Sequence, residues 1–229
     1  MLVQIYTAQS VDEALALARL GVDRVGVTVS DIGLPGEIDL AGGREIVTAL
    51  RGRATSTALT VSTDPDTILD LALALSPDVL HLCGELDALP PTAVGELRDR
   101  LLQSIPGLQL MQAIPVTGPA AVEQAIAYAP VADHLLLDSV TDDVQGIGAA
   151  GTTHDWSISA EVVARVDVPV ILAGGLSPDN VADAVRAVGP AGVDSLTLTN
   201  EADPGGGFRK DLDAVERFVR AARSTEAMR

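Results

Sequence analysis

Short runs of β-branched and aliphatic residues alternate along the chain with longer stretches whose apolar residues recur at helical spacing. The first helical stretch, for example, has an apolar face formed by Leu15, Ala18 and Leu20. The predicted strands span residues 3–6, 24–29, 57–62, 79–82, 109–114, 134–137, 168–173 and 195–198. The predicted helices span residues 11–20, 40–50, 65–75, 92–104, 120–128, 160–166, 178–188 and 212–222.

This alternation predicts the fold class. A strand that returns through a helix runs parallel to its neighbour, so eight such units predict a parallel α/β sheet. The length of 229 residues fits one (β/α)8 TIM barrel of about 250 residues, and residues 1–229 are expected to form a single domain. An open doubly wound sheet is the alternative, but no G-x-G-x-x-G run follows the first predicted strand.

Charge and composition narrow the set of partners. The net charge is −17 and only 2% of residues are aromatic, which argues against nucleic acid and anionic membranes as partners. No apolar run approaches the roughly 20 residues of a membrane span, and no basic leader region opens the sequence. Cys83 is the only cysteine, so no intrachain disulfide forms and a reducing, cytoplasmic location is expected.

Lysine chemistry is limited as well. Lys210 is the only lysine, and it follows the glycines of residues 205–207 in a polar segment. Schiff-base and pyridoxal-phosphate enzymes need a buried lysine amine, so neither chemistry is expected and no cofactor is predicted. The acidic, lysine-poor surface is typical of a protein from a high-salt cytoplasm and equally of an ordinary solvated face.

The strongest local signal lies in residues 172–180, where a strand ends in Gly174-Gly175 and Ser-Pro-Asp-Asn opens a helix. Glycines let the backbone approach an anion closely, and free N–H groups at a helix start favour phosphate. This pattern predicts a phosphate site; the alternative is a plain tight turn with Ser177 as the helix cap. The residues assigned to the phosphate site are Gly174, Gly175, Asn180, Thr197 and Thr199.

Asp138 directly follows an apolar strand and should stand at the rim of the barrel mouth, where active sites of this fold lie. A desolvated carboxyl there suits a general acid or base; the alternative is a cap on the following loop. Residues 140–155 are longer than a usual connection and rich in glycine, so we expect a mobile lid, with a disordered insertion as the alternative.

His81 and Cys83 alternate along the fourth strand and should face the same side. A zinc site would need further ligands, and neither His134 nor His154 has ligand spacing, so the site is expected to be metal-free. The polar residues expected to line the substrate pocket are Gln4, Tyr6 and Gln112.

Several motifs together give the chain a family resemblance. They are residues 135–138 (Leu-Leu-Leu-Asp), 155–156 (Asp-Trp), 169–176 (Pro-Val-Ile-Leu-Ala-Gly-Gly-Leu), 179–180 (Asp-Asn) and 192–194 (Gly-Val-Asp). In these motifs the chain resembles the phosphoribosylanthranilate isomerase family of tryptophan biosynthesis over essentially its whole length. The resemblance implies an Amadori rearrangement, in which an acid protonates the furanose ring oxygen and a base removes the proton from C2′. It assigns the acid to Asp138.

The departures from that family pattern concern the chemistry. Tyr6 occupies the position of the family's catalytic Cys, and a phenol of pKa near 10 is a poor base at neutral pH. The Arg that holds the substrate carboxylate in the family falls within residues 34–36, Leu-Pro-Gly, and is absent. The family's Gln-Leu-His-Gly becomes residues 81–84, and its Ser-Ser-Gly phosphate loop becomes residues 196–198.

Two functional interpretations follow. The first is an isomerase acting on a phosphorylated sugar or aminosugar, with Asp138 as the acid and Cys83 or His81 as the base. The second is a catalytically silent barrel that binds a phosphorylated metabolite as a sensor or partner subunit. Either protein is expected to be a monomer or a homodimer.

Overall fold

The described part of the chain folds into a closed barrel of eight parallel strands surrounded by eight α-helices, and the predicted fold class is confirmed. The computed structural model describes residues 1–140, 145–149 and 151–224. The barrel strands are β1 Leu2–Ile5, β2 Arg24–Thr28, β3 Thr55–Thr60, β4 Val79–Leu82, β5 Gln109–Pro115, β6 His134–Asp138, β7 Val170–Leu172 and β8 Gly192–Ser195. The helices are α1 Val11–Arg19, α2 Leu40–Leu50, α3 Pro65–Leu75, α4 Pro91–Ser104, α5 Ala120–Tyr128, α6 Trp156–Arg165, α7 Val181–Val188 and α8 Leu212–Ser224.

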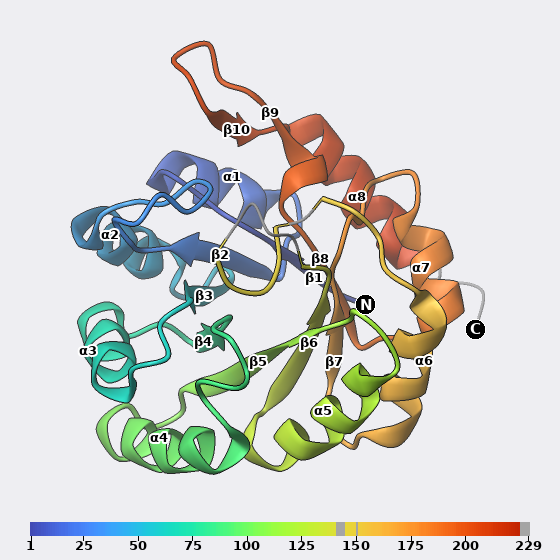
Figure 1. Ribbon diagram of the computed structural model, residues 1–229. Helices are drawn as coiled ribbons and strands as arrows, with labels where there is room; N and C mark the ends of the chain where they lie inside the picture. The colour runs from blue at the N-terminus through green and yellow to red at the C-terminus, as the bar shows by residue number, and fades with distance from the viewer. Residues whose placement is uncertain (141–144, 150, 225–229) are drawn as a thin grey trace.

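Local signals set where several helices begin. The side chain of Ser10 accepts a hydrogen bond from the Glu13 N–H at the start of α1, and Asp39 does the same for Gly42 at the start of α2. Such caps satisfy N–H groups that have no partner inside the helix. The helices form a ring outside the strands (Figure 1).

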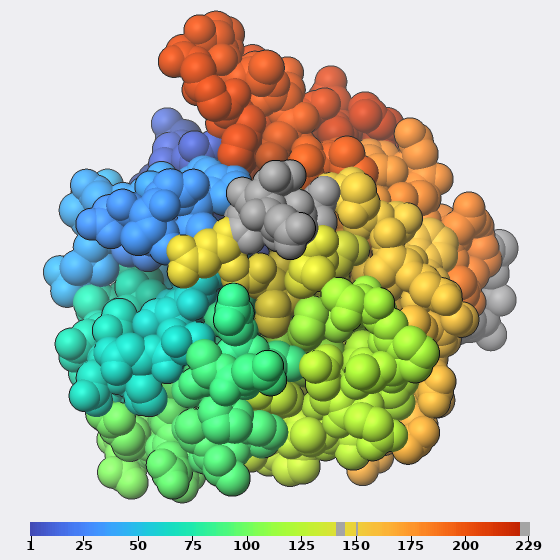
Figure 2. Space-filling model, in the orientation of Figure 1, coloured from blue at the N-terminus to red at the C-terminus, as the bar shows by residue number. Residues whose placement is uncertain are grey.

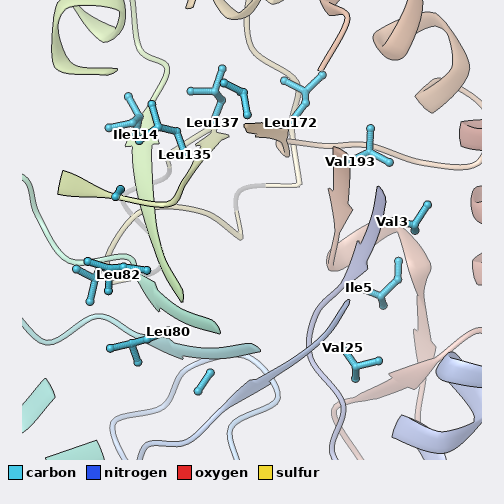
Figure 3. Close-up of a cluster of buried hydrophobic side chains, with 14 of the residues drawn as sticks. Val3, Ile5, Val25, Leu80, Leu82, Ile114, Leu135, Leu137, Leu172 and Val193 are labelled. Atoms are coloured by element: carbon cyan, nitrogen blue, oxygen red, sulfur yellow. The ribbon is translucent and has the colours of Figure 1, made fainter. Parts of the chain in front are cut away.

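Strand periodicity separates an outer from an inner layer of side chains. Leu135 and Leu137 of β6 belong to the large core between strands and helices, part of which Figure 3 shows. Leu136, between them in sequence, packs inside the barrel with Met111 and Ile171. The inner side of the barrel is therefore filled below its mouth, and the space for a ligand lies at the carboxyl ends of the strands.

Several boundaries differ from the prediction. Strand β8 ends at Ser195, where residues 195–198 were predicted, because its register pairs Leu2 with Gly192 and Ile5 with Ser195. Helix α7 begins at Val181 rather than at residue 178, because residues 177–180 form a separate turn first. Helix α6 begins at Trp156, four residues earlier than predicted, with Asp155 as its cap.

A short antiparallel hairpin, formed by β9 Asn200–Ala202 and β10 Phe208–Lys210, was not predicted. It follows a 3-10 turn at Thr197–Thr199 and projects from the barrel, at the top of Figure 1. A second 3-10 turn, Ala129–Val131, follows α5. No helix within the described ranges is long and apolar enough to cross a membrane.

Gly26 on β2 makes room for the aromatic ring of Tyr6. A Cβ atom at Gly26 would lie 2.1 Å from Cδ1 and from Cε1 of that ring, far inside van der Waals contact. The Tyr6 side chain is buried, so the ring has little freedom to move aside. Glycine at position 26 and tyrosine at position 6 are therefore coupled.

We expect Gly26→Ala to lower the free energy of unfolding by about 3 kcal/mol, because overpacking forces the ring or the strand to move. In a Tyr6→Cys background the same substitution should cost less than about 1 kcal/mol, since contacting residues couple. Chemical denaturation measures both values. Gly118→Ala, whose Cβ meets nothing within 4 Å, is the control; an equal cost of Gly26→Ala in both backgrounds would contradict the coupling.

Candidate active site

A pocket with an empty volume of about 550 Å³ lies among the carboxyl ends of the barrel strands. Its lining combines polar and aliphatic groups. The polar lining residues are Tyr6, Thr28, His81, Cys83, Asp138, Gln145 and Asp194. The apolar lining residues are Leu34, Pro35, Leu59, Val61, Ile147, Ala149 and Leu196. Three predicted catalytic residues, His81, Cys83 and Asp138, are thus brought together in one pocket.

Tyr6, His81 and Cys83 form a buried hydrogen-bonded chain across the floor of this pocket. The Tyr6 hydroxyl lies 3.0 Å from Nδ1 of His81, and Sγ of Cys83 lies 3.3 Å from Nε2 of the same ring. One imidazole therefore joins groups on β4 and at the end of β1. In the neutral tautomers, one ring nitrogen donates and the other accepts.

Burial keeps all three members of the chain uncharged at neutral pH. It raises the pKa of the Tyr6 phenol and of the Cys83 thiol well above their ordinary values. Burial, together with the charge of Arg24, lowers the pKa of His81 to about 3. A neutral thiol and phenol are poor bases, and an imidazole of such low pKa has little affinity for a proton.

Asp138 and Asp194 are the two carboxyl residues among the described residues that line the pocket. Burial, followed by the charge of Asp194, raises the pKa of Asp138 to about 8, while the Ser139 N–H donates to Oδ1 at 2.7 Å and opposes that shift. Burial raises the pKa of Asp194 to about 7, and Nε2 of Gln4 donates to its Oδ1 at 3.0 Å. Near neutral pH the pair therefore offers both a protonated and an ionised carboxyl group.

Asp194 was not among the predicted site residues, although residues 192–194 were recognised as part of a motif. The prediction placed the eighth strand at residues 195–198, so Asp194 fell before the strand and far from the mouth. In the structure β8 spans Gly192–Ser195, and Asp194 lies near its carboxyl end. The error of three residues in the predicted strand bounds is the reason that Asp194 was missed.

Residues 145–149, in the segment after β6, contribute to the lining of the pocket. The Ile147 N–H donates to the Cys83 carbonyl at 2.8 Å, and a Cβ at Gly148 would lie 2.7 Å from Oδ2 of Asp138. Figure 2 shows yellow atoms of this segment beside blue and cyan atoms on the same face. The predicted mobile lid spans residues 140–155, of which 141–144 and 150 lie outside the described residues, and its mobility stays a prediction.

A second cavity, with an empty volume of about 290 Å³, adjoins the pocket and shares Asp138 and Asp194 with it. Gly174 and Gly175 line it from the β7 side, and Thr197 lines it from the 3-10 turn after β8. Within the described residues, the N–H groups of both glycines lack a hydrogen-bond acceptor. Loops after strands seven and eight with a short extra helix are where barrels of this fold often bind phosphate.

Two predicted phosphate residues lie beside this cavity rather than on it. The Asn180 side chain accepts from the Ser177 N–H at 2.8 Å and donates to the Gly175 carbonyl at 2.9 Å, so it braces the glycine turn. Thr199 is buried, and its hydroxyl donates to the Leu196 carbonyl at 3.1 Å. Both residues hold the shape of the cavity without lining it.

Gln112 does not reach the pocket, contrary to the expectation. Its neighbours Met111 and Ala113 pack inside the barrel, so Gln112 faces the opposite side of β5. Its Nε2 donates to the carbonyls of Leu82 and Ala113. Gln4 lies inside the barrel, where its Nε2 donates to Oδ1 of Asp194, and it does not line the pocket itself.

Lys210 is buried, which corrects the expectation that its polar segment supplies no buried lysine amine. Its Nζ donates to the Tyr6 carbonyl and, at 2.5 Å, to Oδ1 of Asn200, and only 4% of the residue is exposed. Burial lowers its pKa to about 7. The lysine ties β10 to the end of β1, and it is not among the residues that line the pocket.

No group of three or more His, Cys, Asp or Glu side chains among the described residues is arranged to hold a metal ion. His134 contacts Arg24, the first residue of β2, at 2.8 Å. His154 contacts the hydroxyls of Ser139 and Ser159.

Comparisons with known proteins agree on one family. A family model described as N-(5'phosphoribosyl)anthranilate (PRA) isomerase matches residues 44–221. The N-(5'-phosphoribosyl)anthranilate isomerase of Haloferax volcanii is 39% identical over 215 residues, which cover 91% of this chain and 87% of that protein.

Solved structures agree as well. The phosphoribosyl anthranilate isomerase of Thermotoga maritima has a TM-score of 0.79 at 27% identity and covers 98% of this chain and 99% of its own. A phosphoribosyl anthranilate isomerase in complex with reduced 1-(o-carboxyphenylamino)-1-deoxyribulose 5-phosphate has a TM-score of 0.77 at 25% identity, with coverage of 98% and 99%.

The raised pKa of Asp138 predicts a pH-dependent stability. The unfolded carboxyl ionises near pH 3.9, whereas the folded one keeps its proton up to about pH 8. Its stabilising contribution is therefore complete below about pH 4 and is lost as the pH rises through about 8. Asp138→Asn should accordingly raise Tm more at pH 8.5 than at pH 5, by roughly 2–4 °C per 1 kcal/mol gained. Calorimetry at both pH values measures this, and an equal change would contradict the buried, protonated carboxyl.

Proposed function

The chain belongs to the N-(5'-phosphoribosyl)anthranilate isomerase family, and we propose that it catalyses an Amadori-type isomerisation of a 5'-phosphoribosyl amine. One observation carries the proposal. Asp138 and Asp194 line both the mixed pocket and the glycine-lined cavity beside it. A ligand with its phosphate in the cavity would therefore have its sugar next to both carboxyl groups. The silent-barrel alternative is not favoured, because the relatives are isomerases and the carboxyl pair is present.

The reaction needs an acid and a base at two neighbouring atoms. Protonation of the furanose ring oxygen lets the bond from that oxygen to C1′ break, which leaves a C1′–nitrogen double bond. Removal of the C2′ proton then gives an enolamine, which becomes the ketone. Asp138 is the proposed acid, because its raised pKa of about 8 keeps it protonated at neutral pH.

Asp194 is the proposed base. His81 and Cys83 were the candidates from the sequence, but burial keeps the thiol protonated and leaves the imidazole a weak base. Asp194, with a pKa of about 7, is the pocket group with a substantial ionised fraction at neutral pH. The Tyr6–His81–Cys83 chain then acts as a neutral, hydrogen-bonded floor beneath the sugar.

The phosphate is proposed to bind the backbone of Gly174, Gly175 and the turn that starts at Thr197. Free N–H groups in a glycine turn and at the start of a short helix attract anions without a cationic side chain. Asn180 and Thr199 support this cradle by holding its two loops. No metal or cofactor takes part in the proposed reaction.

The wider setting of the protein is also a proposal. A single, buried cysteine and the biosynthetic family favour a cytoplasmic location. The acidic net charge of −17 makes nucleic acid an improbable partner. The oligomeric state, monomer or homodimer, stays a prediction.

Substitution of the two carboxyl groups tests the mechanism. Asp138→Asn and Asp194→Asn should each lower kcat by about 10²–10⁴-fold, because each removes one proton-transfer group. Cys83→Ser should lower it less than about tenfold. The assay uses 5'-phosphoribosyl amines made from anthranilate and from aniline, with exposed Asp179→Asn as the control. No turnover of either compound by the unmodified protein would overturn the proposed function, and a larger loss in Cys83→Ser than in Asp194→Asn would move the base to Cys83.

The same pair predicts a bell-shaped dependence of kcat/KM on pH. Activity should rise as Asp194 ionises near pH 7 and fall as Asp138 ionises near pH 8. The apparent pKa values of the acidic and the basic side of this profile belong to the interacting pair rather than to either residue alone. In the Asp194→Asn variant the acidic limb should disappear from the residual activity; its persistence there would argue against Asp194 as the base.

Charge reversal tests the phosphate cradle. Thr197→Asp adds a carboxylate to a cavity proposed to bind a dianion, so inhibition by inorganic phosphate should weaken at least about tenfold. Thr197→Asn, of similar size and without charge, should change it less than about threefold. Inhibition constants from competition with the substrate measure both. An unchanged constant in Thr197→Asp would place the phosphate elsewhere at the mouth.

A further inference from the structure

Five apolar residues line the pocket but not the glycine-lined cavity beside it, and they form what we call the apolar wall. Leu34 and Pro35 come from the connection after β2, Leu59 and Val61 from the end of β3, and Ile147 from the segment after β6. Leu34 and Ile147 are only 8% and 9% exposed, so this wall is packed rather than loose. In the proposed function, the phosphate lies in the glycine-lined cavity and the sugar lies between the carboxyl groups. The group attached to nitrogen then faces this apolar wall.

Positive charge is missing from that wall. None of the described lining residues is Lys or Arg. In the sequence, the eight segments that follow the barrel strands contain only two Lys or Arg residues, Arg209 and Lys210. Arg209 is exposed and pairs with Glu201 at 2.8 Å, and Lys210 is held by the Tyr6 carbonyl and Asn200. Neither is available to an anion in the pocket.

Three backbone N–H groups in the connection after β2 are also occupied. The carboxylate of Glu37 accepts hydrogen bonds from the N–H groups of Ile32, Gly33 and Leu34 at 3.0–3.2 Å, and from the Ser30 hydroxyl. The connection after β2 is therefore folded around a negative charge of its own. These three N–H groups cannot serve a second carboxylate, and Glu37 would repel one nearby.

A carboxylate against this wall would be costly. An ionised carboxyl moved from water to an apolar site needs a paired charge or several hydrogen-bond donors. The neutral polar groups that remain in the lining, such as Thr28 and Gln145, cannot replace a cation. Ionised Asp194, which lines the same pocket, adds like charge.

We propose that the nitrogen substituent of the substrate is an uncharged, apolar, aryl-like group, so that this chain prefers 5'-phosphoribosyl amines without a carboxylate on that group. This inference rests on the proposed function, because it takes the phosphate and sugar positions from it. It makes Leu34 the position where an added cation should change the charge preference. Position 36 is unsuitable for an added cationic side chain, because Gly36 has φ +67° and a Cβ there would lie 2.3 Å from Cγ2 of Thr7 and 2.8 Å from Cζ of Phe208.

Two product analogues that differ in one group test the proposal. The first is reduced 1-(o-carboxyphenylamino)-1-deoxyribulose 5-phosphate, and the second is the same compound without the carboxyl group. Isothermal titration at pH 7.5 gives Kd for each. We expect the unmodified protein to bind the carboxyl-free analogue at least tenfold more tightly. Leu34→Arg should bring the two values together or reverse them, because it supplies a bidentate partner for the carboxylate.

Two controls separate the pocket charge from other effects. Ile32→Arg adds the same charge to the same connection at a residue that is 54% exposed and outside the pocket lining, so it should keep the tenfold preference. Leu34→Met changes the shape without charge and should keep it too. Circular dichroism and Tm establish that each variant is folded. If Leu34→Arg fails to fold, Pro35→Arg on the same wall replaces it.

The outcomes distinguish this inference from the proposed function. Equal or tighter binding of the carboxylated analogue by the unmodified protein would overturn the inference and leave the isomerase function standing. No binding of either analogue would overturn both. A preference that Ile32→Arg abolishes as strongly as Leu34→Arg would also overturn the inference, because the effect would then come from the overall field and not from the pocket wall.

Discussion

Parallel pairing of β1 with β8 closes the sheet, and the candidate site depends on this closure. The register that joins Gln4 to Asp194 lets their side chains form a hydrogen bond of 3.0 Å across 190 positions of sequence. It also places the Tyr6 N–H on the Ser195 carbonyl at 3.0 Å. A closed barrel has no free edge through which water can enter between strands, so polar groups near its mouth lose much of their hydration. Lys210 supports the closure from outside, through the Tyr6 carbonyl.

Loss of hydration then divides the titratable groups of the mouth into different roles. It disfavours every charged form, so it raises the pKa of acids and lowers that of bases. Tyr6, His81 and Cys83 all become neutral as a result, although they are the groups that look most reactive in the sequence. Asp138 and Asp194 are shifted to values near neutrality, where proton transfer in both directions is easiest.

The aromatic ring of Tyr6 accounts for much of what distinguishes this barrel from the pattern of its family. The ring lies where a Cβ on Gly26 would otherwise be, and its hydroxyl reaches His81 on β4. A small side chain at position 6 would leave this part of the floor open. With the floor filled by Tyr6, the pocket keeps the carboxyl groups of Asp138 and Asp194 and the aliphatic side chains around Leu34.

Local sequence determined the repeating units of this protein, while the tertiary structure decided which of their side chains meet. The predicted bounds of α2, α3 and α5 agree with the structure to the residue, because caps, prolines and apolar spacing act over a few residues. The glycine turn, Asp138 and the family were also recognised from short motifs. Asp194 and the hydrogen bonds that Glu37 accepts from its own loop were not recognised, since strand register and loop folding depend on contacts with distant segments. Only the closed barrel put Asp138 and Asp194 in one desolvated space, and their charge states follow mainly from that burial.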